Sequence, residues 1–494
     1  MERHFKKIFV VTVVIKLMLA YFFPITSDEA YFLTWGKNLD INYYDHPPMT
    51  GWIVYLFSFL GNHIFFHRLF PIICGIIVAI VMYLIARDIF KDEAKARLIA
   101  MAFLVAPLNI LFVLISTDTP LFLFVFLAGV SFYYAVNLRR GYLFLVAGIL
   151  LGLAVLSKYF AGLLLIAFAG CLIIRWNRDT IRNGLILLLG AAPFVLLNLY
   201  WNYNNCWTNV MFNIFIRNEN VSLELGHFLY FIVFQLYLAT PWLIYYLAKN
   251  MGTVKAGIKR DNNLFFHMYI IPISITGLVA FHSTGLHWVL SFYPFLFFLL
   301  IYLNKEQILR IVKYSAIFSL IHIVTITAIL SLPIETFKKH GKYSYIVMGF
   351  YGDEIYNNLK KYRDRYAFGT TNYATAAMMA YHSGESFFVF GRGSKHGRHN
   401  DKVMDFRELD GRNILILKNK KLKVRDYRDY FKRIRVETIK VRQASFDIAL
   451  GEGFNYHKYR ELILPRILQK YYNIPKFLPV GSCFFYSKYF PNRE

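Results

Sequence analysis

The sequence predicts a multi-pass α-helical membrane protein with about eleven spans and a C-terminal extracytoplasmic α/β domain. Three observations lead to this fold class. Hydrophobic residues make up 57% of the 494 residues, which is more than an ordinary soluble domain needs. Apolar runs near the length of a bilayer-spanning helix recur up to residue 332. Lys and Arg are unevenly divided between the segments that connect these runs.

The apolar runs predict the spans in chain order. The first run has a basic start but no small-residue cleavage site, so we interpret it as an uncleaved helix, in which Lys16 snorkels toward the inner surface. The apolar stretch 49–66 is interrupted by Gly51 and Gly61. We interpret it as an interfacial helix rather than an extra span, because the excess of Lys and Arg in the inner segments is then kept. The predicted spans cover roughly residues 7–25, 69–87, 98–115, 119–137, 142–156, 159–174, 183–200, 227–248, 264–281, 288–303 and 311–332.

Charge distribution sets the predicted orientation. With the N-terminus inside, the inner segments carry 19 Lys and Arg, whereas the outer loops before residue 333 carry 4, namely Lys37, Arg68, Lys158 and Arg217. This asymmetry is typical of an inside-to-outside arrangement. It places the loop 26–68 and everything after residue 332 outside the cytoplasm.

The chain is predicted to hold two domains, a transmembrane domain at 1–332 and an extracytoplasmic α/β domain at 333–494. In the second domain, short apolar runs predict strands and two polar-apolar segments predict helices. The predicted strands are Tyr345–Met348, Phe387–Phe390, Ile414–Leu417, Ile434–Val441, Phe446–Leu450 and Cys483–Tyr486, and the predicted helices are Asp353–Arg365 and Asn372–His382.

Net charge and cysteines narrow the partners. The chain has a formal charge of +25, and residues 333–494 hold 31 Lys and Arg against 16 Asp and Glu. A basic domain that faces outward suits lipid phosphates or acidic glycans and excludes nucleic acid as a partner. Of the four cysteines, Cys206 and Cys483 are both expected outside and could pair, but the sequence does not fix their distance.

Polar groups gather at the predicted outer ends of several spans. Asp28 and Glu29 follow the first span, and Asp45 and His46 precede Pro47-Pro48 in the same loop. Further groups are Ser116–Pro120 with Asp118, Ser157–Tyr159 with Lys158, and His282–Trp288 with His287. A carboxylate can act as a general base on an incoming hydroxyl or amine, and a cation or metal ion can stabilise a departing phosphate. The combination suits group transfer from a lipid phosphate.

These motifs resemble the GT-C membrane glycosyltransferases of the protein-mannosyltransferase type, a superfamily that includes the aminoarabinose transferase of lipid A. The resemblance covers most of the chain and rests on the order and spacing of its pieces. The pieces are Ser27-Asp28-Glu29-Ala30-Tyr31, Tyr44-Asp45-His46-Pro47-Pro48-Met49, Arg68-Leu69-Phe70-Pro71, Thr117-Asp118-Thr119-Pro120-Leu121, Leu156-Ser157-Lys158-Tyr159, His287-Trp288, Tyr293-Pro294, Asn372-Tyr373-Ala374-Thr375-Ala376 and Gly397-Arg398-His399-Asn400.

The resemblance implies a sugar donor on a polyprenyl phosphate and no nucleotide cofactor, and the absence of a Rossmann-type Gly-rich loop agrees with this. Asp28 matches the essential first-loop carboxylate, and Asp118 matches a second outer-loop acid, so Asp28, Glu29 and Asp118 are the predicted catalytic residues. Lys158, Arg217 and His46 are the predicted ligands of the donor phosphate. His46 stands where aminoarabinose-type members carry a lysine, so its positive charge depends on pH.

A divalent metal ion is a further implied cofactor, for which Asp45, His46 and His287 are the candidate ligands. Each candidate also has a purely structural interpretation. Asp28 could cap a helix, Asp118 could cap the fourth span, and Asp45 and His46 could stabilise a turn. Lys158 could snorkel to lipid headgroups.

We therefore expect a glycosyltransferase of the bacterial inner membrane that moves a hexosyl or pentosyl group from a polyprenyl-phosphate donor to a lipid, glycan or glycolipid acceptor, lipid A included. Protein O-mannosyl transfer is the alternative within the same class. A lipid-linked sugar transporter or flippase is a rival, but it predicts ionisable groups along a path through the spans. A membrane scaffold is a third possibility, and it leaves the cluster of acids unexplained.

Overall fold

The computed structural model describes residues 2–175, 177–219, 223–261, 263–282, 285, 287–419 and 421–491. Its contacts divide the chain into two units that do not follow chain order. The helical unit comprises Met1–Phe23, Phe57–Leu197 and Asn220–Leu330. The α/β unit comprises Pro24–Leu56, Asn198–Glu219 and Ser331–Glu494. Two predicted outer loops therefore pack with the C-terminal segment.

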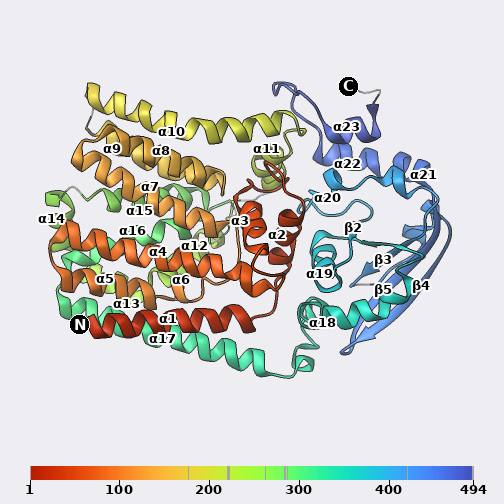
Figure 1. Ribbon diagram of the computed structural model, residues 1–494, viewed down its shortest axis with the longest axis horizontal. Coiled ribbons are helices and arrows are strands. Elements are labelled where there is room, and N and C mark those ends of the chain that lie inside the picture. Colours follow the sequence, from red (N-terminus) through yellow and green to blue (C-terminus); the bar gives the residue numbers. More distant parts are fainter. Residues whose placement is uncertain are drawn as a thin grey trace. The chain divides into compact units, whose positions relative to one another are not determined.

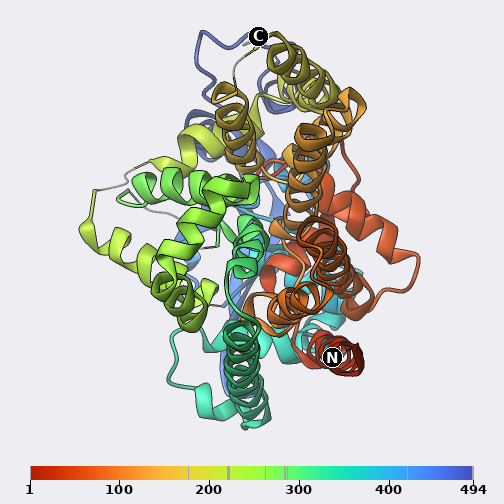
Figure 2. The ribbon, with the colours of Figure 1, turned by 90° about the vertical axis from the view of Figure 1, so that its left-hand side faces the viewer.

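The helical unit is a bundle of apolar helices, which lie side by side in Figure 1 and are seen nearly end-on in Figure 2. Close approach depends on small residues: a Cβ atom on Gly148 would lie 2.0 Å from the carbonyl oxygen of Leu187. The helices are α1 (Glu2–Phe22), α4 (Ile64–Phe90), α5 (Glu93–Val105), α6 (Pro107–Ile110), α7 (Asp118–Leu138), α8 (Gly141–Val155), α9 (Gly162–Ile173), α10 (Arg178–Tyr203), α12 (Leu225–Ala239), α13 (Pro241–Lys249), α14 (Met251–Asp261), α15 (Leu264–Val279), α16 (Tyr293–Phe297) and α17 (Lys305–Ser331).

The multi-pass helical fold is confirmed, whereas the count of eleven spans is not. Within the described residues, 4 helices are long and apolar enough to cross a membrane, or up to 7 if each bent pair counts as one span. The predicted span 227–248 is bent by 86° between α12 and α13. Thr240 at this break has φ +66° and Pro241 follows, so the helix cannot continue straight. The predicted span 98–115 is likewise interrupted, at Pro107.

Lys16 does not snorkel, which corrects the prediction from the sequence. Its side chain is 1% exposed, and its Nζ donates a hydrogen bond to Asn109 Oδ1 at 3.1 Å. Gly75 makes room for this pair, because a Cβ there would lie 2.3 Å from Asn109 Oδ1. A polar partner inside the bundle thus replaces the headgroup contact.

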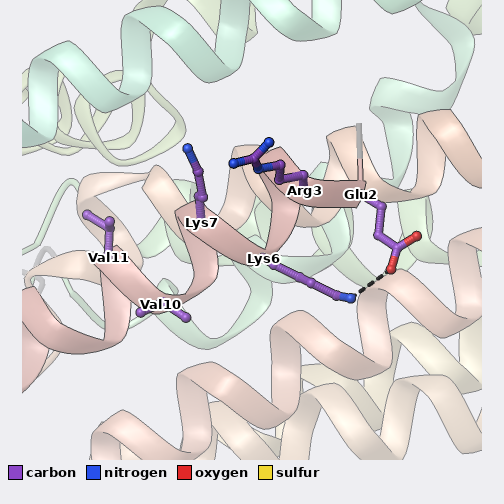
Figure 3. A pocket seen from close by; sticks show the side chains of 6 residues that line it. All are labelled: Glu2, Arg3, Lys6, Lys7, Val10 and Val11. Atoms are coloured by element: carbon purple, nitrogen blue, oxygen red, sulfur yellow. Dashed lines mark ion pairs between the residues drawn. The ribbon is translucent and has the colours of Figure 1, made fainter.

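The basic N-terminal end of α1 borders an open pocket of about 740 Å³ (Figure 3). Its lining residues are Glu2, Arg3, Lys6, Lys7, Val10 and Val11, and Glu2 forms an ion pair with Lys6 at 2.8 Å. Arg3, Lys6 and Lys7 are cations that the sequence places at the inner membrane surface. The pocket contains none of the predicted catalytic residues.

The α/β unit is built on a five-stranded mixed sheet of order β2-β1-β3-β5-β4. Strands β1, β2 and β3 are parallel, and β5 is antiparallel to both β3 and β4. The β4–β5 hairpin turns at Arg442 and Gln443, which both have positive φ, as a two-residue turn matching the strand twist requires. The strands are β1 (Ala367–Thr370), β2 (Phe387–Val389), β3 (Ile414–Lys418), β4 (Phe431–Val441) and β5 (Ala444–Phe454).

Helices lie beside this sheet, and its strands β4 and β5 form an outer edge that, among the described residues, no helix covers in Figure 1. Helices α2 and α3 of the first loop belong to the same unit. The interfacial-helix region 49–66 is not one continuous helix, because α3 ends at Ser58 and α4 begins at Ile64; α3, with 10 residues, is too short to span a bilayer. The helices that start in this unit are α2 (Ser27–Lys37), α3 (Met49–Ser58), α11 (Thr208–Val210), α18 (Tyr343–Leu359), α19 (Tyr373–Ser383), α20 (Asn400–Val403), α21 (Tyr456–Leu462), α22 (Leu464–Tyr471) and α23 (Phe484–Tyr489).

Two of the predicted strands are helical in the structure, and the strand β1 (Ala367–Thr370) was not predicted. The predicted strand Tyr345–Met348 lies in helix α18. The buried residues of this helix include Val347, Gly352 and Ile355, which recur at helical spacing. Cys483–Tyr486 runs into α23, which buries Phe485 and Tyr489 one turn apart. Short apolar runs do not distinguish a strand from one buried helical turn.

Cys206 and Cys483 form a disulfide between residues 277 positions apart in the chain. Cys206 N–H also donates to the carbonyl oxygen of Ser482 at 3.3 Å. The bond attaches the segment 198–219 to the C-terminal segment within the α/β unit. Such a covalent link is stable in an oxidising compartment, which agrees with the predicted outer location of both cysteines.

Candidate active site

The start of helix α2 separates the two neighbouring acids of the first loop. Thr26 is the N-cap: its hydroxyl oxygen accepts a hydrogen bond from Glu29 N–H at 3.2 Å, and Glu29 Oε2 accepts one from Thr26 N–H at 3.1 Å. This capping box buries Glu29 and leaves Asp28 exposed. Asp28 does not cap the helix. Its carboxylate is open to solvent, and the catalytic roles of Asp28 and Glu29 both stay predictions.

The C-terminal segment contacts Asp28 through Tyr373, the first residue of α19. The Tyr373 hydroxyl donates a hydrogen bond to Asp28 Oδ1 at 3.2 Å. Burial raises the pKa of this hydroxyl, and the charge of Asp28 raises it further, so Tyr373 remains a donor at neutral pH. Gly397 crosses the Tyr373 ring with φ +71°, where a Cβ atom would lie 2.1 Å from the ring. Only glycine fits this crossing.

Asp45 is buried between the first loop and the C-terminal segment. Its Oδ1 accepts a hydrogen bond from the Tyr31 hydroxyl at 2.8 Å, and its Oδ2 accepts one from Gly397 N–H at 2.7 Å. The side chain is 4% exposed, and burial raises the pKa of this carboxyl to about 6. Both carboxylate oxygens therefore have donors. The structure favours Asp45 as an organising residue of the loop, and His46 follows it at the turn closed by Tyr43 N–H on the His46 carbonyl.

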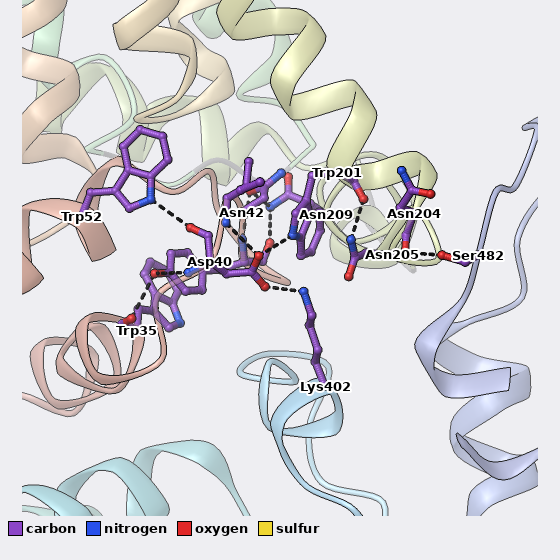
Figure 4. A network of polar contacts seen from close by, with 12 residues as sticks. Trp35, Asp40, Asn42, Trp52, Trp201, Asn204, Asn205, Asn209, Lys402 and Ser482 are labelled. Carbon is purple, nitrogen blue, oxygen red and sulfur yellow. Dashed lines mark hydrogen bonds and ion pairs between the residues drawn. The ribbon is translucent and has the colours of Figure 1, made fainter. Parts of the chain in front are cut away.

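A polar network around Asp40 joins the first loop, the segment 198–219 and the C-terminal segment (Figure 4). Asp40 Oδ1 accepts from Trp201 Nε1 at 2.7 Å, Asp40 Oδ2 pairs with Lys402, and the Asp40 carbonyl accepts from Trp52 Nε1 at 2.9 Å. Asn209 Nδ2 donates to the Tyr43 carbonyl at 2.6 Å. Asp40 and Lys402 were not predicted from the sequence, because nothing in their local sequence indicates a pair 362 residues apart.

His396 lies within electrostatic range of Asp28 and of two cations. Desolvation lowers the pKa of His396, the positive charges of Lys395 and Arg217 lower it further, and the negative charge of Asp28 acts in the opposite direction. Lys395 Nζ donates to the Arg217 carbonyl at 3.2 Å, which fixes the two residues together. The predicted phosphate ligand Arg217 thus belongs to a basic environment. Lys395 and His396 were missed, although they directly precede the motif Gly397–Asn400.

Arg398 and His399 of the motif Gly397–Asn400 are buried and support the loop that contains Gly397. Arg398 is 4% exposed, and its Nε and Nη2 contact Asp401 Oδ2 at 2.8 and 2.7 Å. Arg398 Nη1 also donates to the Arg392 carbonyl at 2.6 Å. Burial lowers the pKa of His399 to about 4, so this imidazole is neutral at physiological pH. These contacts hold the loop that presents Gly397 N–H to Asp45.

In the helical unit, two predicted site residues form one buried ion pair. Lys158 Nζ lies 2.8 and 2.9 Å from the two carboxylate oxygens of Asp118, and their side chains are 5% and 8% exposed. His287 Nε2 is 3.6 Å from Asp118 Oδ2. Asp118 starts α7 without capping it, since the N-cap Thr117 has no side-chain cap bond. Lys158 does not snorkel. Ser283, Thr284 and Leu286 of the same predicted segment lie outside the described residues.

The residues that the structure describes include no group of three or more His, Cys, Asp or Glu side chains placed to hold a metal ion. Asp45 already accepts two hydrogen bonds, from Tyr31 and Gly397. The metal role of Asp45, His46 and His287 stays a prediction, and no chemical step below depends on it. Arg68, from another matched motif, donates to the carbonyls of Ala20 at 2.9 Å and Phe23 at 2.6 Å and so holds the end of α1.

We predict that Asp45 makes stability fall with rising pH between about pH 4 and pH 6. A carboxyl whose pKa is raised from 3.8 to about 6 by folding binds its proton more tightly in the folded state. Its stabilisation is complete below pH 3.8 and is lost as pH rises through 6. The difference corresponds to about 3 kcal/mol, at ~1.4 kcal/mol per pKa unit.

The measurement is the melting temperature of purified protein in detergent from pH 4 to pH 7. Asp45→Asn is expected to flatten the profile, because the amide does not titrate. Asp364→Asn, a change at an exposed aspartate of the same unit, is the matched control and should keep the wild-type profile. Identical slopes in wild type and Asp45→Asn would contradict the prediction.

For the ion pair, we predict that Asp118→Asn or Lys158→Met alone destabilises the protein more than the double substitution does. Removing one partner leaves an uncompensated buried charge, which costs about 3–5 kcal/mol, whereas removing both leaves none. Melting temperatures of the four proteins form a double-mutant cycle. Additive losses would show that Asp118 and Lys158 are not coupled.

Known proteins resemble this chain in sequence and in fold. Residues 45–201 match the family of dolichyl-phosphate-mannose-protein mannosyltransferases. The lipid A galacturonosyltransferase RgtD of Rhizobium johnstonii is 30% identical over 188 residues, which are 37% of this chain and 39% of that relative. The aligned part thus spans well under half of the relative.

Two crystal structures of ArnT from Cupriavidus metallidurans share the fold. The apo structure aligns with a TM-score of 0.62 at 14% identity and covers 91% of this chain and 98% of ArnT. The structure of ArnT bound to undecaprenyl phosphate also aligns with a TM-score of 0.62, at 13% identity, and the alignment covers 89% of this chain and 97% of ArnT. The predicted resemblance to GT-C membrane glycosyltransferases is therefore confirmed, in sequence over residues 45–201 and in fold over most of the chain.

Proposed function

We propose that this protein is a glycosyltransferase of the bacterial inner membrane that moves a hexosyl or pentosyl group from a polyprenyl phosphate to lipid A or another envelope glycan or glycolipid. The observation that carries the proposal is the exposed carboxylate of Asp28, which accepts a hydrogen bond from Tyr373, with His396 within electrostatic range of Asp28 and of the cations Lys395 and Arg217. An open base beside cations is what transfer from a phosphate requires. The lipid-linked ligand of ArnT and the name of RgtD support the donor and acceptor classes.

The proposed step is one displacement at the anomeric carbon. Asp28 accepts the proton of the acceptor hydroxyl, and the acceptor oxygen forms a bond to the anomeric carbon. The bond from that carbon to the phosphate oxygen breaks at the same time, and its electron pair leaves with the polyprenyl phosphate. A single displacement inverts the anomeric configuration. Arg217 and Lys395 are proposed to stabilise the charge that develops on the phosphate.

The remaining predicted residues keep more limited roles in this proposal. Lys158 is a candidate phosphate ligand of the helical unit, and Asp118 balances its charge until an anion competes for it. His46 is a candidate phosphate ligand of the first loop. Protein O-mannosyl transfer is the second candidate function, favoured by the family that residues 45–201 match. It uses the same chemistry at Asp28 with a protein hydroxyl as the acceptor.

We predict that Asp28→Asn reduces transfer by at least about 100-fold, the range that general-base catalysis contributes. Tyr373→Phe should reduce it less, by roughly 2- to 10-fold, since it removes one hydrogen bond of about 0.5–1.5 kcal/mol. The assay incubates purified protein with polyprenyl-phosphate sugars and with either extracted envelope lipids or envelope proteins, and mass spectrometry detects the added sugar.

Asp364→Asn serves as the matched control for the loss of one carboxylate from the α/β unit, and melting temperatures verify that each variant is folded. Transfer to lipids supports the first acceptor class, and transfer to proteins supports the second. Wild-type rates in folded Asp28→Asn would refute the role of Asp28. Movement of the lipid-linked sugar across vesicle membranes without any sugar transfer would show that the protein is a transporter and would contradict the proposed enzyme.

A further inference from the structure

A second recess lies on the α/β unit, away from every residue of the first loop. It has a volume of about 600 Å³ and is formed where the loop before β3, the start of β4 and the end of β5 meet. None of the predicted catalytic or phosphate-binding residues lines it. Its lining residues are Asp410, Gly411, Arg428, Asp429, Phe431, Lys432, Gly453, Phe454, Asn455, His457 and Lys458.

Backbone hydrogen bonds hold the three loops of this recess in fixed positions. Gly411 N–H donates to the Phe454 carbonyl at 2.7 Å, and Phe454 N–H donates to the Arg412 carbonyl at 2.8 Å. Asn455 N–H donates to the Tyr430 carbonyl at 2.8 Å. Gly411 and Gly453 have φ angles of +73° and +62°, which favour glycine, so the wall of the recess has no side chain at these two positions. The recess is therefore preorganised, which lowers the entropic cost of binding.

Three cations and two carboxylates line the recess, so its side chains carry an excess of positive charge that suits an anion. Arg428, Lys432 and Lys458 are exposed, and among the described residues no carboxylate lies within ion-pair distance of these three cations. Such cations bind phosphate or carboxylate groups readily.

The other polar residues suit sugar hydroxyls. Asp410, Asp429 and Asn455 supply carboxylate and amide groups at the same recess. Asp410 Oδ1 accepts a hydrogen bond from Tyr456 N–H at 2.8 Å and Asn455 Oδ1 accepts one from Lys458 N–H at 3.0 Å, so we assign the contacts with hydroxyls to Asp410 Oδ2, Asn455 Nδ2 and Asp429. Phe431 and Phe454 lie beneath as a mostly buried apolar floor, with exposures of 7% and 1%. A lining that mixes acceptors, donors and cations binds a group with hydroxyls and negative charge together, whereas a purely basic surface would favour phosphate alone.

We propose that this recess binds an anionic saccharide, a phosphorylated or carboxylated sugar of the acceptor. Arg428, Lys432 and Lys458 bind the anionic group, and Asp410, Asp429 and Asn455 contact the hydroxyls. The identification of the ligand with the acceptor rests on the proposed function, whereas the binding itself does not. Part of the positive charge of residues 333–494 is thereby assigned to one binding site.

The test measures binding to full-length protein in detergent by calorimetry. The probes are a water-soluble glucosamine disaccharide bisphosphate without acyl chains, the same disaccharide without phosphates, and vesicles that contain phosphatidylglycerol. The variant is Lys432→Ala/Lys458→Ala. The matched control is Lys440→Ala/Lys423→Ala, which removes the same charge from exposed positions of the same domain outside the recess.

We expect the phosphorylated disaccharide to bind at least tenfold more tightly than the unphosphorylated one, and the recess variant to lose at least tenfold in affinity while the control changes less than twofold. Equal losses in both variants would reduce the effect to general charge and overturn the site. Loss of vesicle binding without loss of saccharide binding would assign the cations to lipid headgroups and also overturn it.

A transfer assay on the same variants separates this inference from the proposed function. Saccharide binding that depends on Lys432 and Lys458, in a protein that transfers no sugar, would retain the site and reject the enzyme. Normal transfer to lipid acceptors with an unchanged KM in the recess variant, together with unchanged saccharide binding, would retain the enzyme and reject the site.

Discussion

The buried carboxylate of Asp45 is the interaction that joins the first loop to the C-terminal segment within the α/β unit. Burying a carboxylate is unfavourable unless both of its oxygens receive hydrogen bonds. Tyr31 supplies one donor from the first loop, and Gly397 N–H supplies the other from a position 352 residues away in the chain. Both the loop and the C-terminal segment are therefore needed to satisfy the two oxygens of Asp45. Asp28, one helix turn before Tyr31, is positioned by the same contact surface.

This constraint changes how the C-terminal segment is understood. It does more than cover a site made elsewhere, since Tyr373 contacts Asp28 and the Gly397 loop binds Asp45. The segment 198–219 joins the same unit through the Asp40 network and the disulfide between Cys206 and Cys483. The three parts form one compact unit although they are far apart in the sequence. Residues that the sequence places in separate loops thus share one polar environment.

Some features were predictable because they depend on local patterns. Long apolar runs identified α4, α7, α10 and α17, and alternating or apolar runs identified β2 to β5. Glu29 was predicted to be catalytic, although Thr26-x-x-Glu29 has the spacing of the capping box that the structure contains. Contacts made through space were not predictable. Asp118 and Lys158 were singled out separately, and only the fold shows that each neutralises the other. β1 was missed because it is short and contains Gly369.

The most direct test of this organisation is hydrogen–deuterium exchange, followed by mass spectrometry, in wild type and Asp45→Ala at pH 7. If Asp45 joins the first loop to the C-terminal segment, the substitution will increase exchange in both 24–46 and 372–400, and exchange in β3 and β5 will remain slow. Increased exchange in the first loop alone, with 372–400 as protected as in wild type, would show that the C-terminal segment folds without it and would contradict the central role of Asp45.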